Sequence, residues 1–353
     1  MKKSKPENDD SRGPVTLQVI ADHAGVTRAL VSMALHNSPK VAAATRERIQ
    51  ALARELGYRP NPMVRALMSE VRQRRKRSFQ AKLGFVTNLQ TADCWLGKKG
   101  VYAEYFMGAQ QRGRELGYEV EHFWLGEYRA NPSRLSDILQ ARGIPGLLIP
   151  PLPQDDRTFD LDLSGFRVVA FGYSLQRSNI HRFCNHHVQT IQDAVEQLVR
   201  RGYRHIGIGL GKMEIEQVNY LWLAGLAVAR CRFPGLKISF LNTKKVERAS
   251  FQKWIRRTKP EAVICLGHDT HAWLLELGLR TPEDIGYLHL DCRSDAQISG
   301  MYQNTKRLGI AAVELLATLV EGSISSDDGK PRYVMVNSDF HEGSTLRPLP
   351  AEA

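Results

Sequence analysis

Strand-length apolar runs alternate with longer amphipathic stretches from residue 83 to residue 290 of the chain. Such alternation is typical of parallel, doubly wound α/β sheets, in which helices connect neighbouring strands. The sequence predicts strands at 83–87, 118–123, 146–149, 168–171, 205–210, 236–241, 262–266 and 285–290, and a later one at 332–336. This number exceeds what one small sheet usually holds, so we expect two α/β lobes with a ligand cleft between them.

Between residues 15 and 58 the pattern changes to three short helices. Thr16 and Thr27 are placed to cap the first two helices, and Gly25 suits the left-handed turn that separates them. The second helix is expected to run from Arg28 to His36. Two short helices joined by a tight glycine-containing turn, followed by a third, describe a helix-turn-helix.

A fourth short helix is expected after the break at 58–60. Asn61 is placed as its N-cap, Pro62 takes the first helical position, and the helix is expected to end near Met68. Helices of this length are unstable alone in water, so we expect it to fold only when it pairs with a second copy on DNA.

Charge is distributed unevenly along the 353 residues, whose net charge is +12. Residues 1–82 hold 17 Lys and Arg against 7 Asp and Glu, a net of +10, whereas the remaining 271 hold 32 against 30, a net of +2. A basic N-terminal region on a nearly neutral body is typical of a polyanion-binding module joined to another domain. The alternative is a solvated basic tail.

Composition narrows the class of protein further. No apolar run approaches the length of a membrane helix, and residues 1–12 lack a secretory signal. The five cysteines are widely spaced and odd in number, so they form neither a disulfide framework nor a zinc site. We therefore expect a cytoplasmic protein.

The N-terminal motif reads Thr16-Leu17-x-x-Ile20-Ala21-x-x-Ala24-Gly25-Val26-Thr27-x-x-x-Val31-Ser32, and it continues through Thr45-Arg46-Glu47-Arg48-Ile49 and Leu56-Gly57-Tyr58-x-Pro60-Asn61 to Leu67. These positions resemble the DNA-binding domain of the LacI/GalR family of transcriptional regulators. The rest of the chain resembles the effector domain of that family through shorter motifs, such as Arg201-Gly202-Tyr203 and Thr281-Pro282-Glu283-Asp284-Ile285. The resemblance extends to about residue 344.

The resemblance implies an all-α helix-turn-helix head, a hinge helix and an α/β two-lobed effector domain of the type I periplasmic-binding-protein-like class. We expect a disordered tail at 1–14, the head at 15–59, the hinge and a basic linker at 60–82, and an effector-binding and dimerisation domain at 83–345. Lobe 1 is expected to comprise about 83–184 and 303–330, and lobe 2 about 185–302 and 331–345.

The resemblance also implies how the head would bind operator DNA. Arg28, Ala29 and Met33 match the positions that read bases, and Leu67 matches the residue that the hinge helix wedges into a base step. Phosphate contacts are implied for Thr16, Thr27, Ser32, His36, Lys40 and Thr45. A generic phosphate contact for Arg28 and simple helix packing for Met33 are the alternatives.

For the effector site, the resemblance implies a small molecule held by Phe171, Tyr173, Trp222, His268, Asp269 and Asp291. Trp222 replaces an Arg that is usual at its position, and an indole would stack on a sugar face rather than pair with its hydroxyls. The alternative for each aromatic residue is a place in the core or at the rim of the cleft.

The interpretation that follows is a homodimeric, ligand-responsive transcriptional regulator, expected to be a repressor, without metal or cofactor. Its expected partners are a double-stranded DNA operator and a sugar or sugar derivative. Two alternatives stay open: a ligand-independent DNA-binding protein with a degenerate cleft, and an enzyme with a DNA-binding head. The sequence shows no catalytic constellation that would favour the enzyme.

Overall fold

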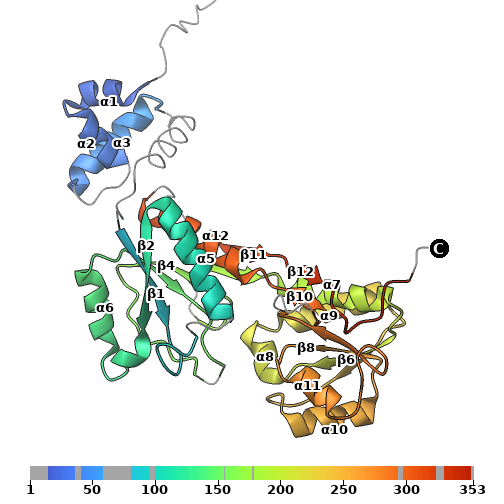
Figure 1. Cartoon of the computed structure of the whole chain (residues 1–353). Coiled ribbons are helices and arrows are strands. Elements are labelled where there is room, and N and C mark those ends of the chain that lie inside the picture. Colours follow the sequence, from blue (N-terminus) through green and yellow to red (C-terminus); the bar gives the residue numbers. More distant parts are fainter. Residues whose placement is uncertain are drawn as a thin grey trace, which may run out of the picture. The chain divides into compact units, whose positions relative to one another are not determined.

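The structure is a computed structural model that describes residues 15–35, 41–58, 81–95, 100–154, 156–176, 179–292, 297–322 and 330–350. The chain divides into two compact units: one holds the helical head, residues 1–78, together with residues 317–327, and the other is an α/β body of residues 79–316 and 328–353 (Figure 1). Among the described helices, none has the length and apolarity that crossing a lipid bilayer demands.

The head consists of α1 (Leu17–Ala24), α2 (Arg28–Leu35) and α3 (Ala43–Glu55). The Thr16 hydroxyl caps α1 by accepting a hydrogen bond from the Val19 amide at 3.4 Å. Gly25 ends α1 in the left-handed conformation, at φ 66°, as the sequence predicted. The three helices share a small core of Ile20, Ala21, Val31, Ala34, Val41, Ile49 and Ala53.

The first sheet of the body, which defines lobe 1, has six parallel strands in the order β11-β5-β4-β3-β1-β2. Its strands are β1 (Ala81–Thr87), β2 (Tyr118–Trp124), β3 (Gly146–Ile149), β4 (Arg167–Phe171), β5 (His181–Asn185) and β11 (Tyr333–Val336). Phe85 contacts Phe106 of α5 (Val101–Leu116), whereas its neighbour Val86 packs with Leu135 of α6 (Pro132–Ala141). Because successive strand residues face opposite sides, helices cover both faces of this sheet.

The second sheet, which defines lobe 2, has the order β12-β10-β9-β8-β6-β7, with only β12 antiparallel. Its strands are β6 (His205–Gly209), β7 (Lys237–Phe240), β8 (Ala262–Cys265), β9 (Gly286–His289), β10 (Gly300–Tyr302) and β12 (Asp339–His341). Ala262 and Ile264 of β8 face a core shared with α7 (His187–Arg200) and α9 (Leu221–Arg232). Val263 and Cys265 face the opposite core, with α10 (Arg248–Thr258) and α11 (Thr270–Leu275).

The remaining helices are η1 (Leu125–Tyr128), α8 (Lys212–Gln217) and α12 (Thr305–Val320). α12 packs on α5 of lobe 1, where a Cβ added at Gly108 would lie 2.1 Å from the Lys306 carbonyl oxygen. The chain therefore crosses between the lobes three times: after β5, before α12 and between β11 and β12. This arrangement confirms the predicted two-lobed, doubly wound fold.

A buried polar network joins the first and third crossings. The Asn185 amide donates to the Ser338 hydroxyl at 2.7 Å, and the Thr190 hydroxyl donates to the Asn185 carbonyl oxygen at 2.8 Å. The hydroxyls of Thr190 and Ser338 are themselves 2.8 Å apart. Fully satisfied networks of this kind fix one geometry, because any unpaired member would be costly in the interior.

Three strands were not predicted, and one was assigned to the wrong lobe. β10 and β12 have three residues each, and β5 carries a buried Arg182 that hides its strand pattern. β11 was expected in lobe 2, within residues 331–345. It belongs to lobe 1, where it pairs in parallel with β5.

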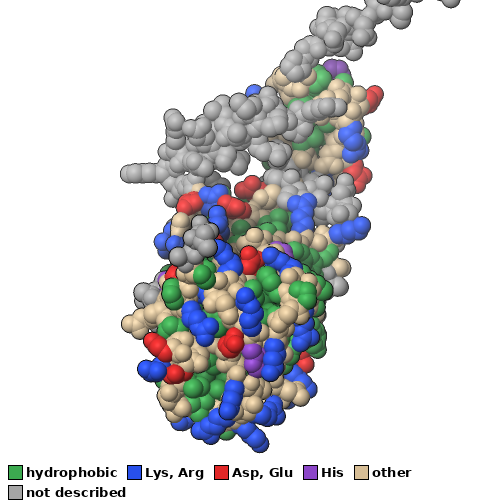
Figure 2. All heavy atoms as spheres, turned by 90° about the vertical axis from the view of Figure 1, so that its right-hand side faces the viewer, with side chains coloured by type: hydrophobic (Ala, Val, Ile, Leu, Met, Phe, Trp, Pro, Cys, Tyr) green, Lys and Arg blue, Asp and Glu red, His purple; other side chains and the backbone are tan. Residues whose placement is uncertain are grey.

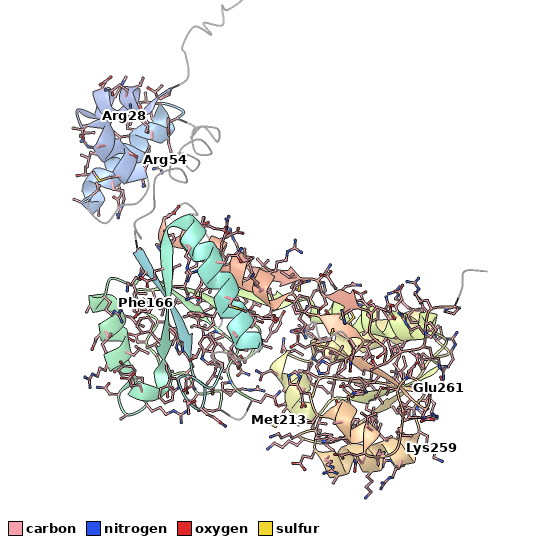
Figure 3. All side chains as sticks on the ribbon, viewed as in Figure 1. Arg28, Arg54, Phe166, Met213, Lys259 and Glu261 are labelled. Atoms are coloured by element: carbon pink, nitrogen blue, oxygen red, sulfur yellow. The ribbon has the colours of Figure 1, made fainter. Side chains whose placement is uncertain are left out.

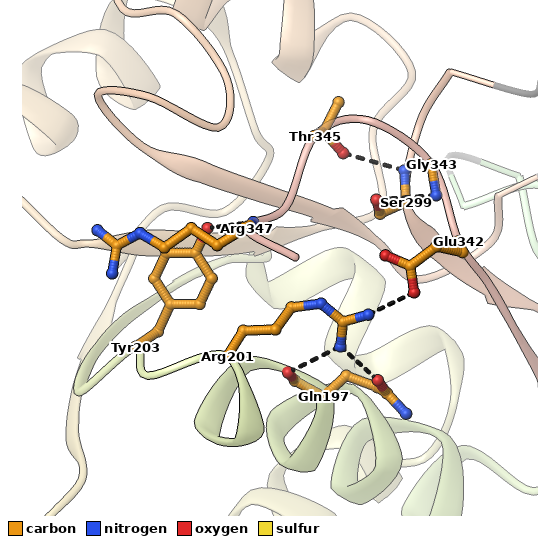
Figure 4. Close-up of polar contacts among 8 residues, drawn as sticks. All are labelled: Gln197, Arg201, Tyr203, Ser299, Glu342, Gly343, Thr345 and Arg347. Atoms are coloured by element: carbon orange, nitrogen blue, oxygen red, sulfur yellow. Dashed lines mark hydrogen bonds and ion pairs between the residues drawn. The ribbon is translucent and has the colours of Figure 1, made fainter. Parts of the chain in front are cut away.

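The segment after β12 packs on lobe 2 through polar contacts with the buried residues Arg201 and Tyr203 (Figure 4). Arg201, whose side chain is 1% exposed, pairs with Glu342 and donates to the Gln197 backbone carbonyl at 3.1 Å. The Arg347 amide donates to the Tyr203 hydroxyl at 3.0 Å. A buried guanidinium needs such partners, because leaving it unpaired is strongly destabilising.

The close approach of α7 and α9 depends on one glycine. A Cβ added at Gly225 would lie 2.2 Å from the Ile191 Cγ2 atom and 2.6 Å from the Val188 carbonyl oxygen. No residue other than glycine fits without displacing backbone.

We predict that Gly225→Ala lowers the stability of the body by about 1–3 kcal/mol, the usual cost of overpacking a core. Gly235→Ala is the matched control, since nothing lies within 4 Å of its added Cβ. Chemical denaturation followed by circular dichroism measures both. Equal midpoints for the two variants would contradict the close contact.

Candidate DNA-binding head and effector site

The outward face of α2 carries the residues predicted to contact DNA. Arg28, Ala29 and Met33 are exposed, and Ser32 is half-buried beside them. These positions are one and four residues apart, so they lie on one side of the helix. Arg28 is therefore an exposed cation on the outward face of α2 (Figure 3).

The opposite side of α2 fixes that face in place. Val31 and Ala34 have no exposed surface and pack in the head core. The Gln50 amide of α3 donates to the Ala34 carbonyl at 2.9 Å, and the Arg48 guanidinium donates to the Ala24 carbonyl at 3.3 Å. These bonds satisfy carbonyl groups at the carboxyl ends of α2 and α1, which have no partner within their own helices.

The amino ends of the head helices differ in how they are capped. The Thr27 hydroxyl accepts from the Leu30 amide at 3.3 Å, as predicted. Ala42 precedes α3 without a side-chain cap, and Thr45 is half-buried in its first turn. His36, Lys40, Asn61 and Leu67 lie outside the described residues.

The candidate effector site is built at the carboxyl ends of the strands. Phe171 ends β4, is fully buried, and packs on Tyr105 of α5 with ring centroids 4.3 Å apart. Burial, together with the nearby charge of Asp291, raises the pKa of Tyr105. The structure therefore brings Phe171 and Asp291 to the same neighbourhood, from lobe 1 and lobe 2 respectively.

A second group joins Tyr173, His187 and Trp222. Tyr173 is half-buried, its ring 6.2 Å from that of His187, and its hydroxyl accepts from the Cys184 thiol at 3.2 Å. The His187 ring meets the edge of Trp222 at 4.5 Å. Burial lowers the pKa of His187 to about 3, so this imidazole is neutral at physiological pH.

Trp222 is fully buried in the core of lobe 2, as Phe171 is in lobe 1. Neither side chain offers surface to a ligand in this conformation, so both are core residues. Trp222 packs against the His187 ring and has no contact with solvent. A stacking role would require the surrounding residues to move.

The third group follows β8 and β9. The exposed His268 ring stacks on His289 at 5.4 Å, and the Asp291 amide donates to the His289 Nδ1 atom at 3.1 Å. Asp269 is exposed next to His268. No cluster of three metal-binding side chains occurs among the residues that the structure describes.

Tyr105, His187 and His289 are site residues that the sequence reasoning missed. His289 is the last residue but one of the strand predicted at 285–290, two residues before Asp291, so its position near the carboxyl end of that strand was a usable signal. Tyr105 lies within a helix and His187 opens one, and neither position stands out without the fold. Only packing across the sheet brings them to the site.

Comparison with known proteins bears on both units. The profile "Bacterial regulatory proteins, lacI family" matches residues 16–61, and the "Periplasmic binding protein-like domain" profile matches residues 195–335. The transcriptional regulator PtxS of Pseudomonas aeruginosa is 25% identical over 327 residues, covering 88% of this chain and 91% of that protein. The match with the regulator AscG of Escherichia coli is shorter, 26% identical over 203 residues and 56% of that protein.

Two solved structures share the fold along nearly the whole chain. The transcriptional regulator CelR–cellobiose complex has a TM-score of 0.61 at 21% identity, covering 94% of this chain and 99% of that one. The Lac repressor dimer bound to operator and the anti-inducer ONPF has a TM-score of 0.57, with the same identity and coverage.

The two profiles fall on the head and on the body, in the order that the sequence predicted. The relatives are transcription regulators, which decides against the alternative of an enzyme. This chain belongs to the LacI family of bacterial transcriptional regulators, with a helix-turn-helix DNA-binding head and a periplasmic-binding-protein-like effector domain.

Proposed function

We propose that this regulator is a repressor that reads its operator through the outward face of α2. The observation that supports this proposal is that Arg28, Ala29 and Met33 are exposed on one side of α2. The other side of the helix is packed in the core of the head. A guanidinium recognises guanine through two acceptors, whereas alanine and methionine offer only apolar contact to a thymine methyl.

The remaining DNA contacts assigned from the resemblance belong to the same proposal. Phosphate contacts from hydroxyls and helix amino ends would orient the head without reading sequence. The proposed residues are Thr16, Thr27, Ser32, His36, Lys40 and Thr45, with Asn61 and Leu67 in the hinge. The solved Lac repressor is a dimer on its operator, which supports a homodimer of this chain on a two-fold symmetric site.

For the effector, we propose an uncharged, hydroxyl-rich molecule, a sugar or sugar derivative, bound between the lobes in the cytoplasm. Asp291 supplies a carboxylate acceptor and Tyr173 a half-buried aromatic hydroxyl, while His187 is a neutral imidazole. His268 and Asp269 add polar groups at the adjacent strand end. The CelR structure with cellobiose supports this class.

We predict that Arg28→Ala lowers operator affinity by about 5- to 150-fold, because one bidentate base contact is worth about 1–3 kcal/mol. Selection of bound DNA from a random pool first supplies the operator, and fluorescence anisotropy then measures affinity. Arg54→Ala, which removes an exposed cation from α3, is the control (Figure 3). A selected site that keeps the same base preference without Arg28 would overturn the assignment.

Leu67→Ala should weaken operator binding by about tenfold or more while dimerisation persists, because a smaller side chain cannot hold a base step open. Anisotropy gives the affinity, and analytical ultracentrifugation gives the oligomeric state. Unchanged affinity of a dimeric variant would argue against a hinge wedge.

A thermal-shift panel of neutral sugars and nucleosides should contain at least one stabilising ligand, since a ligand at 100 times its Kd stabilises by about 2.7 kcal/mol. Asp291→Asn should weaken that ligand by about 10- to 100-fold, the loss expected for a hydrogen bond to a charged group. Asp137→Asn in α6 is the matched control. A panel without any stabilising ligand would favour a regulator whose cleft has degenerated.

A further inference from the structure

One end of lobe 2 gathers cations from several elements. Arg204 and Lys237 stand at the amino ends of the neighbouring parallel strands β6 and β7, where the Lys237 amide donates to the Arg204 carbonyl at 2.9 Å. The other members come from α10 and the turn after it. We call this set the basic end of lobe 2: Arg204, Lys237, Lys253, Arg256, Arg257 and Lys259.

The geometry of α10 explains why its cations share one surface. Phe251, Trp254 and Ile255 are buried against the sheet. Lys253, Arg256 and Arg257 lie on the other side of the helix and are exposed. These three are three and four residues apart, which makes them neighbours on the helix surface. Lys259 follows at once and precedes β8, whose amino end lies beside that of β6, and β7 lies on the other side of β6.

The cations of the basic end are not neutralised by ion pairs. Among the described residues, none of its six cations forms an ion pair. Of the described carboxylates near this end of the sheet, Glu261 accepts the backbone amides of Arg204 at 2.6 Å and His205 at 3.3 Å, Asp284 pairs with Arg280, and Glu342 pairs with Arg201. The exposed Glu283 precedes β9 at the same end. Figure 2 shows Lys and Arg side chains spread over this side of the body, with few acidic side chains among them.

The small net charge of residues 83–353, +2, does not reveal the basic end. They hold 32 cations against 30 acidic residues, and without the six they hold 26 against 30, a net of −4. Helix-dipole stabilisation accounts for Arg256 and Arg257 in the last turn of α10. It does not account for Arg204 or Lys237, which lie on other elements.

We propose that the basic end of lobe 2 is a second DNA-binding surface, which contacts the phosphate backbone of duplex DNA without reading its sequence. Phosphate contacts are made by exposed Lys and Arg and need no apolar anchor. A protein partner would instead require aromatic or aliphatic anchors and a surface poor in lysine. No large exposed hydrophobic residue occurs between 242 and 261 of the described chain.

This surface is separate from the effector site. It lies at the amino ends of the strands of lobe 2, whereas His268, His289 and Asp291 lie at or beyond the carboxyl ends of β8 and β9. Figure 3 likewise separates Lys259 and Glu261 from Met213, which follows the carboxyl end of β6. DNA on the basic end would leave the effector site free.

The test compares full-length proteins on a duplex that lacks the operator, by fluorescence anisotropy across 50–200 mM KCl. The variant Lys253→Gln/Arg256→Gln/Arg257→Gln removes three cations while keeping good helix formers. The control Arg134→Gln/Arg167→Gln/Arg307→Gln removes three exposed cations from lobe 1 and α12. Each lost phosphate contact flattens the slope of log K against log salt by about 0.9.

We expect the α10 variant to lose about 2.7 units of that slope if all three cations contact phosphates. Between 50 and 200 mM KCl its affinity should then fall by a factor about 40 times smaller than the factor for the wild type. The control should keep the wild-type slope. Lys237→Gln/Lys259→Gln, from other elements, should show a smaller loss of the same kind and guards against misfolding of the α10 variant.

Equal slopes for the α10 variant, the Lys237→Gln/Lys259→Gln variant and the control would overturn the proposal. Retention on immobilised poly-L-glutamate that depends on α10, together with an unchanged DNA slope, would assign the surface to an acidic protein instead. Because the duplex lacks the operator, the result is independent of whether Arg28 reads a base. Repeating the series with Arg28→Ala separates the two surfaces.

Discussion

The body depends on how the chain passes three times between its two sheets. β11 pairs with β5 on the edge of one sheet, and three residues later β12 pairs with β10 on the edge of the other. Asn185, Thr190 and Ser338 tie the first and last passages together in a buried network. Each lobe is therefore completed by strands that are distant in sequence, and neither could be removed without breaking the other.

The parallel strands of lobe 2 give this lobe two different ends, one at their carboxyl ends and one at their amino ends. Parallel strands carry their carboxyl ends to one edge, where loops are free to hold polar side chains, and their amino ends to the other. His289 and Asp291 lie at or beyond the carboxyl ends, and the charge of Asp291 raises the pKa of Tyr105 of lobe 1, whereas the basic end lies at the amino ends. The proposed effector and the proposed phosphate contacts would therefore use separate surfaces of lobe 2.

The head was predicted closely because its information is local. Thr16, Gly25 and Thr27 act on amides within a few residues of themselves, so caps and turns could be located from spacing alone. The larger sheets were predicted where strands were long and apolar. β5 was missed because its buried Arg182 interrupts the apolar pattern, and β10 and β12 were missed because strands of three residues carry too little pattern.

The sequence by itself determined the class of protein, the order of its units and the outward face of α2, because these follow from periodicity, caps and local charge. Tertiary structure decided what the side chains of the body do. It buried Trp222 and Phe171, brought Tyr105 and His187 to the candidate effector site, and gathered Arg204, Lys237 and the α10 cations at one end. The physical reason is that burial and charge clustering depend on which strands are neighbours, and strand order is set by long-range pairing rather than by local sequence.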